Sequence, residues 1–462
     1  MAGFHIEHFG CRAARADGEA IAGHLQALAE RQPFAADIVV VNTCSVTAEA
    51  DRVARAFIRR AHRRNPAARI VVTGCYAQRA PQELAGLPGV AAVVGNSHKA
   101  LVPEIVFNLA HGSVTNPPPA FLSVASLLSA GTAHNVPVWA DDKFAHSFLE
   151  DLQLAPGVQT RPNLKIQEGC SNRCTFCVIP LTRGPSRSLP RAVVLRHVEE
   201  FVAFGGKELV LSGINLGRWG RDLSSGRGRE SLAGLVRDIF TQTALPRLRL
   251  SSIEPMDWDS DLIELLCEFG PQRLARHAHL PLQSGCDAVL RRMHRRYRPW
   301  HYAEKVSALI SAAGPDLTLG ADVMVGFPGE SDREFDETIA FLRKLPFGYL
   351  HQFPFSPRPG TPGWALHQTS PVPPAAVEER MAVLRAVAAE KTLAHRGRFV
   401  GRNLAAITLH TPEAVAALGR TTALSENFLP INLDGHFPAN QLLDVSVTGS
   451  HSDGSLSGFP SH

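Results

Sequence analysis

The 462-residue chain has no long hydrophobic run. Its longest apolar stretches, such as Leu84 to Gly95, fall well short of the roughly 18 residues that a membrane span requires. Charges interrupt the N-terminal stretch MAGFHIEHFGCRAARADGEA early, and no small-residue cleavage site follows an apolar block. We therefore expect no membrane association and no secretory signal, and we predict a cytoplasmic protein.

The sequence also lacks a strong charge bias and any low-complexity composition. Hydrophobic residues make up 45% and charged residues 19%, which excludes wholesale disorder. The net charge of +4 permits a nucleic-acid partner but does not require one. At about 150 residues per domain, the length predicts two to four domains.

There are eight cysteines. Without a secretory signal, they are expected to be reduced thiols, metal ligands or catalytic groups rather than a disulfide framework.

Residues 1–110 alternate between short apolar runs and helical patterns, which is typical of an α/β domain with a parallel sheet. The runs at 37–42, 69–73 and 90–94 are predicted strands, and 48–64 is a predicted helix. Residues 111–160 are rich in Pro, Ser and Ala and have weak periodicity. We predict a connector there, with a short helix near Asp141 to Leu152.

The alternation resumes over residues 161–396. Six strands are predicted, at 164–168, 208–211, 247–252, 277–282, 317–325 and 349–355. Helical patterns lie between them, for example at 191–204, 331–344 and 375–393. Six successive βα units predict a partial (β/α) barrel, in which chemistry is located at the C-terminal ends of the strands. Residues 397–462 contain short β-like runs, such as Leu404 to Leu409 and Leu442 to Val447, and are predicted to form a small all-β module.

Three cysteines follow the first predicted barrel strand directly. Cys170, Cys174 and Cys177 lie in GCSNRCTFC, with the spacing C-x3-C-x2-C. Three thiolates on one tight loop can hold three irons of a four-iron cluster, so that the fourth iron is open to a small molecule. The alternative is a zinc site on Cys174 and Cys177, whose second pair of ligands would come from Cys267, Cys286, His277 and His279.

Three further cysteines follow successive strands of the N-terminal domain. They are Cys11 in FGC, Cys44 in VVVNTC and Cys75 in VVTGC. Because the ends of parallel strands meet at one edge of a sheet, these thiols are expected to converge and to hold a second cluster with an open iron. The alternative is three buried structural thiols.

The stretch GCSNRCTFCVIPLTRGPSRS resembles the cluster loop of radical S-adenosylmethionine (SAM) enzymes. Together with VVVNTCSVTAEAD, VVTGCYAQ, LSGINLGRWGRDL, HLPLQSGCD, VMVGFPGES and FPFSPRPGTP, it is similar to the methylthiotransferase branch of that superfamily, from about residue 4 to residue 395. RPNLKIQEGC, LTRGPSRS and GINLGRWGRDL look most like the enzymes that methylthiolate N6-threonylcarbamoyladenosine next to the anticodon of tRNA.

This resemblance implies a radical SAM barrel, a C-terminal RNA-binding β-barrel like the TRAM domain, and a mechanism. Cys170, Cys174 and Cys177 would bind a 4Fe-4S cluster whose open iron takes SAM. Cleavage of SAM would give a 5′-deoxyadenosyl radical that abstracts the hydrogen at carbon 2 of the adenine. Cys11, Cys44 and Cys75 would hold a second 4Fe-4S cluster, which carries the sulfur that is methylated and transferred.

The implied partners are tRNA, a low-potential electron donor and a sulfur source, and we expect a monomer. Alternative substrates in the same branch are isopentenyladenosine in tRNA and a ribosomal protein side chain. Two readings from other classes are a zinc-stabilised RNA-binding protein without catalysis and a redox-sensing iron–sulfur protein.

Several other positions are candidate cofactor contacts because they follow predicted strands. By the resemblance, the cofactor-binding residues are Gly213, Asn215, Gln283, Gly326 and Gly329. The two glycines of VGFPGE would let the backbone approach SAM, or would form a plain strand-to-helix turn. Arg183 and Arg187 would contact phosphate or cofactor unless they lie on a solvated loop.

The chain departs from the family pattern near the first cysteine. Ala14, Asp17 and Gly18 stand where the family usually has Asn and a Glu-Ser pair, and Cys286 stands where Ser is usual. These departures put the fine geometry around Cys11 in question.

Two arginine-rich stretches are predicted to bind RNA phosphates rather than to form a solvated surface. The first covers one side of helix 48–64, and Tyr297 of the second is predicted to stack on a base. The arginines are Arg52, Arg55, Arg59, Arg60, Arg63 and Arg64 in the first stretch, and Arg291, Arg292, Arg295, Arg296 and Arg298 in the second.

Residues 421–462 contain no Lys or Arg but four acidic residues, so we expect the C-terminal module to bind RNA weakly or mainly by shape.

Overall fold

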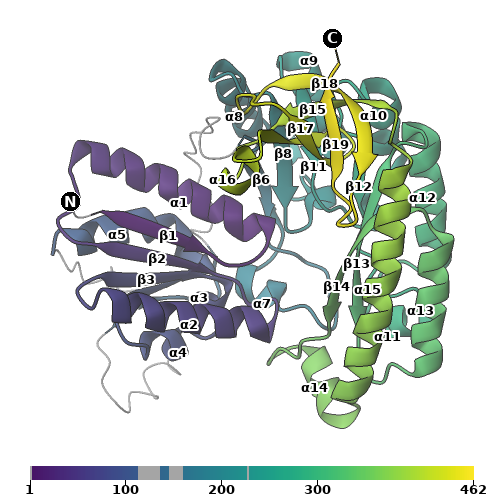
Figure 1. The fold of residues 1–462 in the computed structure, drawn as a ribbon. Helices are drawn as coiled ribbons and strands as arrows, with labels where there is room; N and C mark the ends of the chain where they lie inside the picture. Colours follow the sequence, from purple (N-terminus) through teal and green to yellow (C-terminus); the bar gives the residue numbers. More distant parts are fainter. Residues whose placement is uncertain (1–2, 113–135, 145–159, 226–227, 462) are drawn as a thin grey trace.

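The structure is a computed structural model that describes residues 3–112, 136–144, 160–225 and 228–461. An N-terminal α/β domain lies beside a larger (β/α) barrel, and a small β-barrel packs against the larger one (Figure 1). The expected α/β architecture with its three folded parts is confirmed. Among the described helices, none combines the length and the apolar character needed to cross a membrane.

In the described part of the N-terminal domain, five parallel strands lie side by side in chain order. Val, Ile and Ala fill the strands because both faces of the sheet are covered by helices. The strands are β1 (Phe4–His8), β2 (Ile38–Thr43), β3 (Arg69–Gly74), β4 (Val90–Gly95) and β5 (Val138–Trp139). One face carries α1 (Arg12–Arg31) and α5 (Val102–Ala110), which follows η1 (Asn96–Leu101), and the other carries α2 (Ala48–Arg64), α3 (Cys75–Arg79) and α4 (Pro81–Ala85).

Strand β5 lies within the stretch that we expected to be a connector. It pairs with β4 through Val138 and Trp139 and completes the sheet. A run of two residues is too short to show a period of two, so the strand cannot be recognised from the sequence pattern. The helix expected near Asp141 to Leu152 lies mostly outside the described residues, and 141–144 are not helical.

The described residues of the central region form six parallel strands in chain order, which confirms the expected partial barrel. The two groups of strands join where Leu248 pairs with Leu274. The short antiparallel strand β7 (Arg187–Ser188) borders β6 at one edge, and β14 forms the other edge. The six strands are β6 (Asn163–Glu168), β8 (Glu208–Gly213), β11 (Arg247–Leu250), β12 (His277–His279), β13 (Thr318–Val325) and β14 (Phe347–Pro354).

Helices cover the outside of this barrel (Figure 1). Helix α13 begins with a capping box, in which Ser331 accepts from the backbone N–H of Glu334 and Glu334 accepts from that of Ser331. The longer helices are α8 (Arg191–Ala203), α9 (Leu232–Gln242), α10 (Ser260–Phe269), α12 (Pro299–Ala313), α13 (Asp332–Lys344) and α15 (Pro374–Gly397). Shorter elements are α7 (Ile179–Arg183), η2 (Leu216–Arg218), β9 (Ser224–Ser225), β10 (Gly228–Arg229), η3 (Pro255–Asp257), α11 (Asp287–Arg292) and α14 (Pro362–Thr369).

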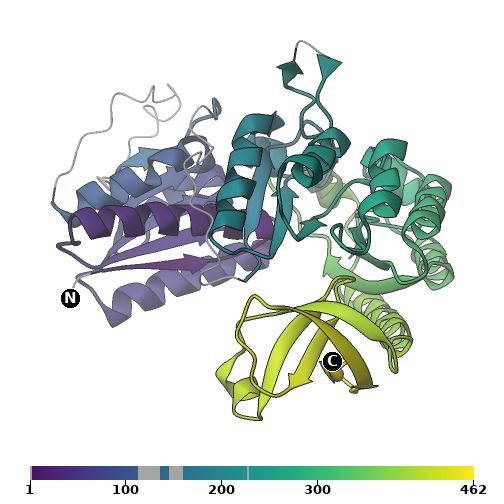
Figure 2. The ribbon, with the colours of Figure 1, turned by 90° about the horizontal axis from the view of Figure 1, so that it is seen from above.

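The C-terminal module is a closed β-barrel with its own apolar core. Figure 2 shows it as a separate body against the larger barrel. Its strands are β15 (Asn403–Thr408), β16 (Arg420–Ser425), β17 (Pro430–Asp434), β18 (Leu442–Ser450) and β19 (Leu456–Pro460), with α16 (Glu413–Ala416) between the first two.

Charged contacts hold this module in place. Glu426 is buried and accepts from the backbone N–H of Arg276 at 3.1 Å and from its Nε at 2.9 Å. Arg402 pairs with Asp316 at 2.6 Å, and buried Arg249 donates to the carbonyl of Ser425 at 3.1 Å. The negative charge of Glu426 therefore belongs to the interface with the barrel and is not displayed to an RNA, contrary to what the acidic sequence suggested.

Candidate active site

The three N-terminal cysteines lie at the same end of the sheet. Cys11 precedes α1, Cys44 follows β2, and Cys75 begins α3 directly after β3. Gly10 adopts a φ of +110°, and a Cβ there would lie 2.7 Å from the sulfur of Cys44, so glycine allows this close approach. Burial raises the pKa of Cys44 to about 12, and the neighbouring thiols of Cys75 and Cys11 add to the shift. These thiols therefore interact, as their sequence positions predicted.

The second set of cysteines lies on the loop between β6 and α7. Gly169 opens this loop with a φ of +69°, where a Cβ would clash with the carbonyl oxygen of Pro185. Burial raises the pKa of Cys177 to about 12, with further contributions from Cys174 and Cys170. A half-buried group of three thiols is stabilised when a cationic metal centre binds the thiolates, because metal binding removes the protons and supplies positive charge.

The two sets of cysteines face a shared space between the domains. Cys11 of the first set and Cys177 of the second both line one cavity of about 350 Å³. A neighbouring cavity of about 510 Å³ is also lined by Cys11, and the two cavities share Ile179 and Asp322. One molecule bound in this space can therefore contact both sets.

A cluster of buried charges joins the two domains beside the first set. Asp17 of α1 and Lys99 of η1 meet Lys165 and Glu168 of β6 and Arg183 of α7, and each of these side chains is at most 8% exposed. Arg183 Nη1 lies 3.1 Å from Asp17 and 2.8 Å from Glu168, and its Nε donates to Cys75 Sγ at 3.2 Å. The expected alternative of a solvated loop is wrong for Arg183, which is 1% exposed.

Burial and charge act in opposite directions on the carboxylates of this cluster. Burial alone would raise the pKa of Asp17, but the ammonium groups of Lys165 and Lys99 and the Arg183 guanidinium lower it below its ordinary value. The pKa of Glu168 lies well below its usual range for the same reason, with Arg183 as the largest lowering influence. Both carboxylates therefore remain ionised. Asp17, which departs from the family pattern, is thus the residue that connects α1 to the barrel.

A second buried arginine serves the barrel cysteines. Arg295 donates from Nη1 to Cys174 Sγ at 3.2 Å and from Nε to the hydroxyl of Tyr297 at 3.0 Å, and it also pairs with Glu254. Each cysteine set therefore has one buried guanidinium bound to one of its sulfurs.

The second arginine stretch is consequently not a free phosphate-binding surface. Arg291 and Arg298 pair with Asp287, Arg292 binds Glu334 through both terminal nitrogens at 2.8 Å, and Arg296 lies 3.6 Å from Asp257. The prediction that Tyr297 stacks on a base is wrong, because its ring is fully buried and its hydroxyl donates to backbone carbonyls.

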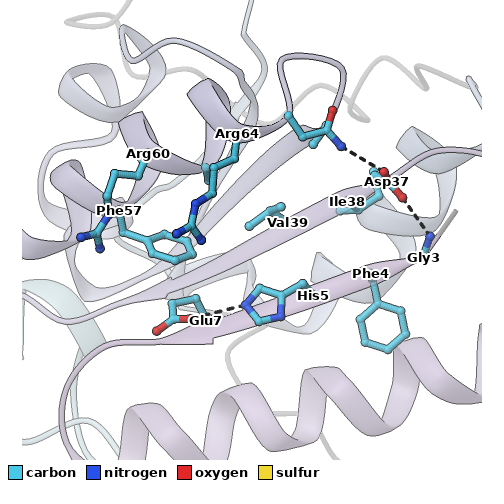
Figure 3. Close-up of a pocket in the computed structure, with 13 residues that line it drawn as sticks. Gly3, Phe4, His5, Glu7, Asp37, Ile38, Val39, Phe57, Arg60 and Arg64 are labelled. Atoms are coloured by element: carbon cyan, nitrogen blue, oxygen red, sulfur yellow. Dashed lines mark hydrogen bonds and ion pairs between the residues drawn. The ribbon is translucent and has the colours of Figure 1, made fainter.

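The first arginine stretch divides into two parts. Arg52 pairs with Glu49, and Arg55 binds Tyr76 and Glu83. The other four side chains, those of Arg59, Arg60, Arg63 and Arg64, are exposed and form no hydrogen bond or ion pair with any residue that the structure describes. Arg60 and Arg64 border a groove of about 670 Å³ beside β1 and β2, together with Phe57, His5 and Val39 (Figure 3).

Three of the five candidate cofactor positions lie at the cysteine loop or the cavities. Asn215 points its amide at Cys170 Sγ at 3.6 Å, Gly213 lines the larger cavity, and Gln283 lines the smaller one. The side-chain oxygens of Asn215 and Gln283 are buried without a hydrogen-bond partner among the described residues. Such atoms are costly to leave unsatisfied, so both residues are suited to bind a ligand.

Gly326 and Gly329 line neither of these two cavities. The backbone N–H of Gly326 donates to Glu330 at 2.7 Å, and a Cβ there would strike Val377 of α15. The N–H of Gly329 donates to the carbonyl of Ser370 at 2.9 Å. This geometry favours the strand-to-helix turn, and a contact with SAM stays a prediction for both.

The alternative zinc site does not form from the proposed residues. Cys267 lies on α10 and donates to the carbonyl of Ala312 at 3.1 Å, while buried Cys286 precedes α11. Across the described ranges, a single group of three possible ligands converges closely enough to hold one ion, and it consists of His279, Asp322 and His351. Arg187, the other candidate of the cysteine loop, donates to the carbonyls of Pro185 and Arg183.

Comparison with known proteins agrees with this arrangement. Residues 3–95 match the "Uncharacterized protein family UPF0004", and residues 164–342 match the radical SAM superfamily. The chain is 36% identical over 373 residues to the threonylcarbamoyladenosine tRNA methylthiotransferase MtaB of Bacillus subtilis, with 78% of this chain and 75% of the relative aligned. It belongs to the radical SAM methylthiotransferase family.

Other relatives of this methylthiotransferase carry a different substrate in their names. A tRNA-2-methylthio-N(6)-dimethylallyladenosine synthase of Erythrobacter litoralis is 34% identical, with 86% of this chain and 84% of the relative aligned. Among solved structures, a radical SAM methyltransferase of Kitasatospora setae aligns with 76% of this chain and 69% of its own at 18% identity and a TM-score of 0.48.

Membership of the family implies SAM and a 4Fe-4S cluster in this methylthiotransferase. The residues fit such a cluster, because Cys170, Cys174 and Cys177 supply three thiols beside a cavity. The orphaned oxygens of Asn215 and Gln283 nearby are suited to the polar groups of SAM.

Sequence reasoning missed the buried arginine beside Cys174 and the His279–Asp322–His351 group. Arg295 lies in an arginine-rich run that is typical of a solvent-exposed surface, so the local sequence does not indicate that its side chain is buried. The other group did leave a signal, because Asp322 interrupts a strand that is otherwise uncharged and His279 lies in a short buried strand with a second histidine. Charged residues in a strand that is otherwise buried indicate either an ion pair or a site.

The contact between Arg295 and Cys174 yields a prediction. Reduction adds negative charge to a cluster, and a buried cationic donor at one of its sulfurs favours the reduced form. We expect Arg295→Gln to lower the reduction potential of the SAM-binding cluster by on the order of 60 mV, which corresponds to about a tenfold change in the one-electron equilibrium.

The measurement is an anaerobic redox titration followed by electron paramagnetic resonance. Arg292→Gln is the matched control, because this nearby arginine pairs with Glu334 and its side chain forms no hydrogen bond with any of the six cluster cysteines among the described residues. Equal potentials in the wild type and Arg295→Gln would contradict the electrostatic role.

Proposed function

We propose that this enzyme adds a methylthio group to carbon 2 of N6-threonylcarbamoyladenosine in tRNA, with the use of two 4Fe-4S clusters. The observation that carries the proposal is the cavity of about 350 Å³ lined by both Cys11 and Cys177. A sulfur-inserting reaction requires a radical generator and a sulfur carrier on one substrate, and these two cysteines place both sets at one space.

The roles of the residues follow from their positions. Cys170, Cys174 and Cys177 hold the SAM-binding cluster, and Cys11, Cys44 and Cys75 hold the second cluster. When bound, the clusters supply the electron that cleaves SAM and the sulfur that becomes the methylthio group. A bound substrate would have to fill this space for a carbon radical to be protected from side reactions with water.

The relatives support the choice of nucleoside. Four of them, from Bacillus subtilis, Aquifex aeolicus, Thermotoga maritima and Rickettsia prowazekii, are named as threonylcarbamoyladenosine tRNA methylthiotransferases and are 30–36% identical to this chain. The dimethylallyladenosine relatives are 30–34% identical. The proposed chemistry also requires a low-potential reductant and a sulfur source. A tRNA substrate implies a cytoplasmic site of action. The proposal includes a monomeric enzyme.

The activity test separates the two cysteine sets. Anaerobically reconstituted enzyme with reductant, SAM and tRNA that lacks the methylthio group is expected to give a methylthio adduct on threonylcarbamoyladenosine, detected by mass spectrometry of the digested RNA. Cys174→Ala should abolish SAM cleavage, whereas Cys44→Ala should abolish the adduct and still yield 5′-deoxyadenosine.

Two results would change the proposal. An adduct on isopentenyladenosine alone, or on a ribosomal protein, would keep the chemistry and replace the substrate. A protein loaded with iron that cleaves no SAM would refute the proposed chemistry.

We also predict that the four unpaired arginines at the end of α2 contribute to tRNA affinity. Phosphate contacts by arginine release counterions, so affinity falls steeply with salt in proportion to the number of contacts. Replacement of Arg59, Arg60, Arg63 and Arg64 by Gln should weaken binding at low salt by tenfold or more and reduce the slope of log affinity against log salt by on the order of three.

The control is Arg237→Gln with Arg333→Gln, because these surface arginines already face Glu268 and Glu337. An unchanged salt slope in the α2 variant would show that tRNA binds elsewhere. Loss of binding on removal of residues 397–462 alone would assign the affinity to the C-terminal module.

A further inference from the structure

The larger cavity between the domains has a polar wall that the cluster ligands do not account for. Gly10, Cys11 and Ala13 form its N-terminal side. The barrel side consists of residues within or directly after five strands, among them Ser212, Ser251, His279, Asp322 and His351. This wall lies opposite Cys11, at the place where a substrate would meet the sulfur carrier of the proposed function.

Two hydroxyl groups in this wall have no partner. Ser212 and Ser251 are 1% and 5% exposed, and neither Oγ atom has a hydrogen-bond partner among the described residues. A buried polar atom left unsatisfied destabilises a protein by roughly 1–3 kcal/mol. Their position at the cavity indicates that a bound molecule completes their hydrogen bonding.

The histidine at the mouth of this wall is held in one orientation. His351 Nδ1 lies 3.2 Å from Asp322 Oδ1, and His279 Nε2 lies 3.1 Å from the same oxygen. Burial alone would raise the pKa of Asp322, but hydrogen bonds from His279 and His351 lower it below its ordinary value. The carboxylate is therefore ionised and accepts an N–H from each ring.

This arrangement defines what His351 can recognise. With Nδ1–H donated to Asp322, the Nε2 atom of the neutral ring is a hydrogen-bond acceptor. The His351 side chain is 59% exposed, and the residue lines the cavity. Together with the two serine hydroxyls, the wall offers an acceptor and two groups that donate.

A network behind the wall fixes these positions. The hydroxyl of Tyr349 lies 2.9 Å from His279 Nδ1 and 2.8 Å from His277 Nε2. The ring of His277 in turn stacks on Phe428 of the C-terminal module, with the ring centres 4.2 Å apart. The orientation of His279 therefore depends on the docked position of that module.

We propose that Ser212, Ser251 and His351 form a subsite for a polar hydroxy-acid substituent on N6 of the substrate adenosine. This inference rests on the proposed function and names the residues that would select its substrate. A threonylcarbamoyl group has carbonyl and carboxylate oxygens for the serine hydroxyls, and N–H and O–H groups for His351 Nε2. An isopentenyl group has none of these, so it would leave the two buried hydroxyls unpaired, which a binding site strongly disfavours.

A metal ion is the competing occupant of the same residues, because the three candidate ligand atoms lie within 4.8 Å of one another. Its binding would require the ring nitrogens that face Asp322 to release their protons and would break both hydrogen bonds to the carboxylate. The metal analysis in the test below distinguishes the two occupants.

The test uses holoenzyme reconstituted anaerobically and two synthetic anticodon stem-loops that differ only in the N6 substituent, threonylcarbamoyl or isopentenyl. Fluorescence anisotropy gives the two dissociation constants. The wild type should prefer the threonylcarbamoyl loop, and both His351→Phe and Ser212→Ala should reduce that preference by about tenfold, as expected for loss of one hydrogen bond to a charged or polar group.

His351→Gln is the matched control, because Gln retains both a donor and an acceptor and should restore part of the preference. Iron content and melting temperature identify variants that have not folded. Variants that fold and keep the wild-type preference would overturn the subsite, as would a metal ion beyond the cluster iron that is lost in His351→Phe. A wild type that prefers the isopentenyl loop would instead refute the substrate of the proposed function.

Discussion

The buried charge cluster between the N-terminal domain and the barrel is the constraint on which the arrangement of the site depends. Asp17 and Glu168 lie among Lys99, Lys165 and Arg183, closed off from solvent. Removal of one partner from such a group leaves an unpaired buried charge, which typically destabilises a protein by about 3–5 kcal/mol. The cluster therefore favours the domain arrangement that pairs all of its charges, and in that arrangement Cys11 and Cys177 line the same cavity. The relative position of the two cysteine sets thus depends on charge pairing that includes Arg183, which also donates to Cys75.

The charge balance of the cluster explains why it lies beside a cysteine. Three cations and two carboxylates leave one positive charge in excess, and Arg183 directs that charge at Cys75 Sγ. A thiolate bound to iron would neutralise it, so the interface and a metal centre at the N-terminal cysteines stabilise each other. Arg295 plays the corresponding part at Cys174, where Glu254 and Tyr297 hold the guanidinium in position. A hydrogen bond from a buried cation to a cluster sulfur is one of the means by which proteins adjust the reduction potential.

The sequence predicted the fold well because the parallel strands are fully buried and are thus near-continuous apolar runs, as in Ile38–Thr43 and Thr318–Val325. It also predicted that Cys11, Cys44 and Cys75 converge, because their positions after successive parallel strands fix their place at one edge. It failed where a side chain meets partners that are distant in the sequence. Arg295 and Arg183 look like surface arginines in their local sequence, and only the tertiary structure reveals the carboxylates and sulfurs that they meet. The four arginines at the end of α2 remain exposed because no carboxylate lies opposite them among the described residues.

The central claim is that two separate three-cysteine sets each hold a four-iron cluster with one open iron. Iron analysis combined with Mössbauer spectroscopy of anaerobically reconstituted protein tests it most directly. We predict about eight irons per chain in the wild type, and about four after replacement of either Cys11, Cys44 and Cys75 or Cys170, Cys174 and Cys177 by Ala. A wild type with about four irons, all of them retained when the N-terminal cysteines are replaced, would contradict the account.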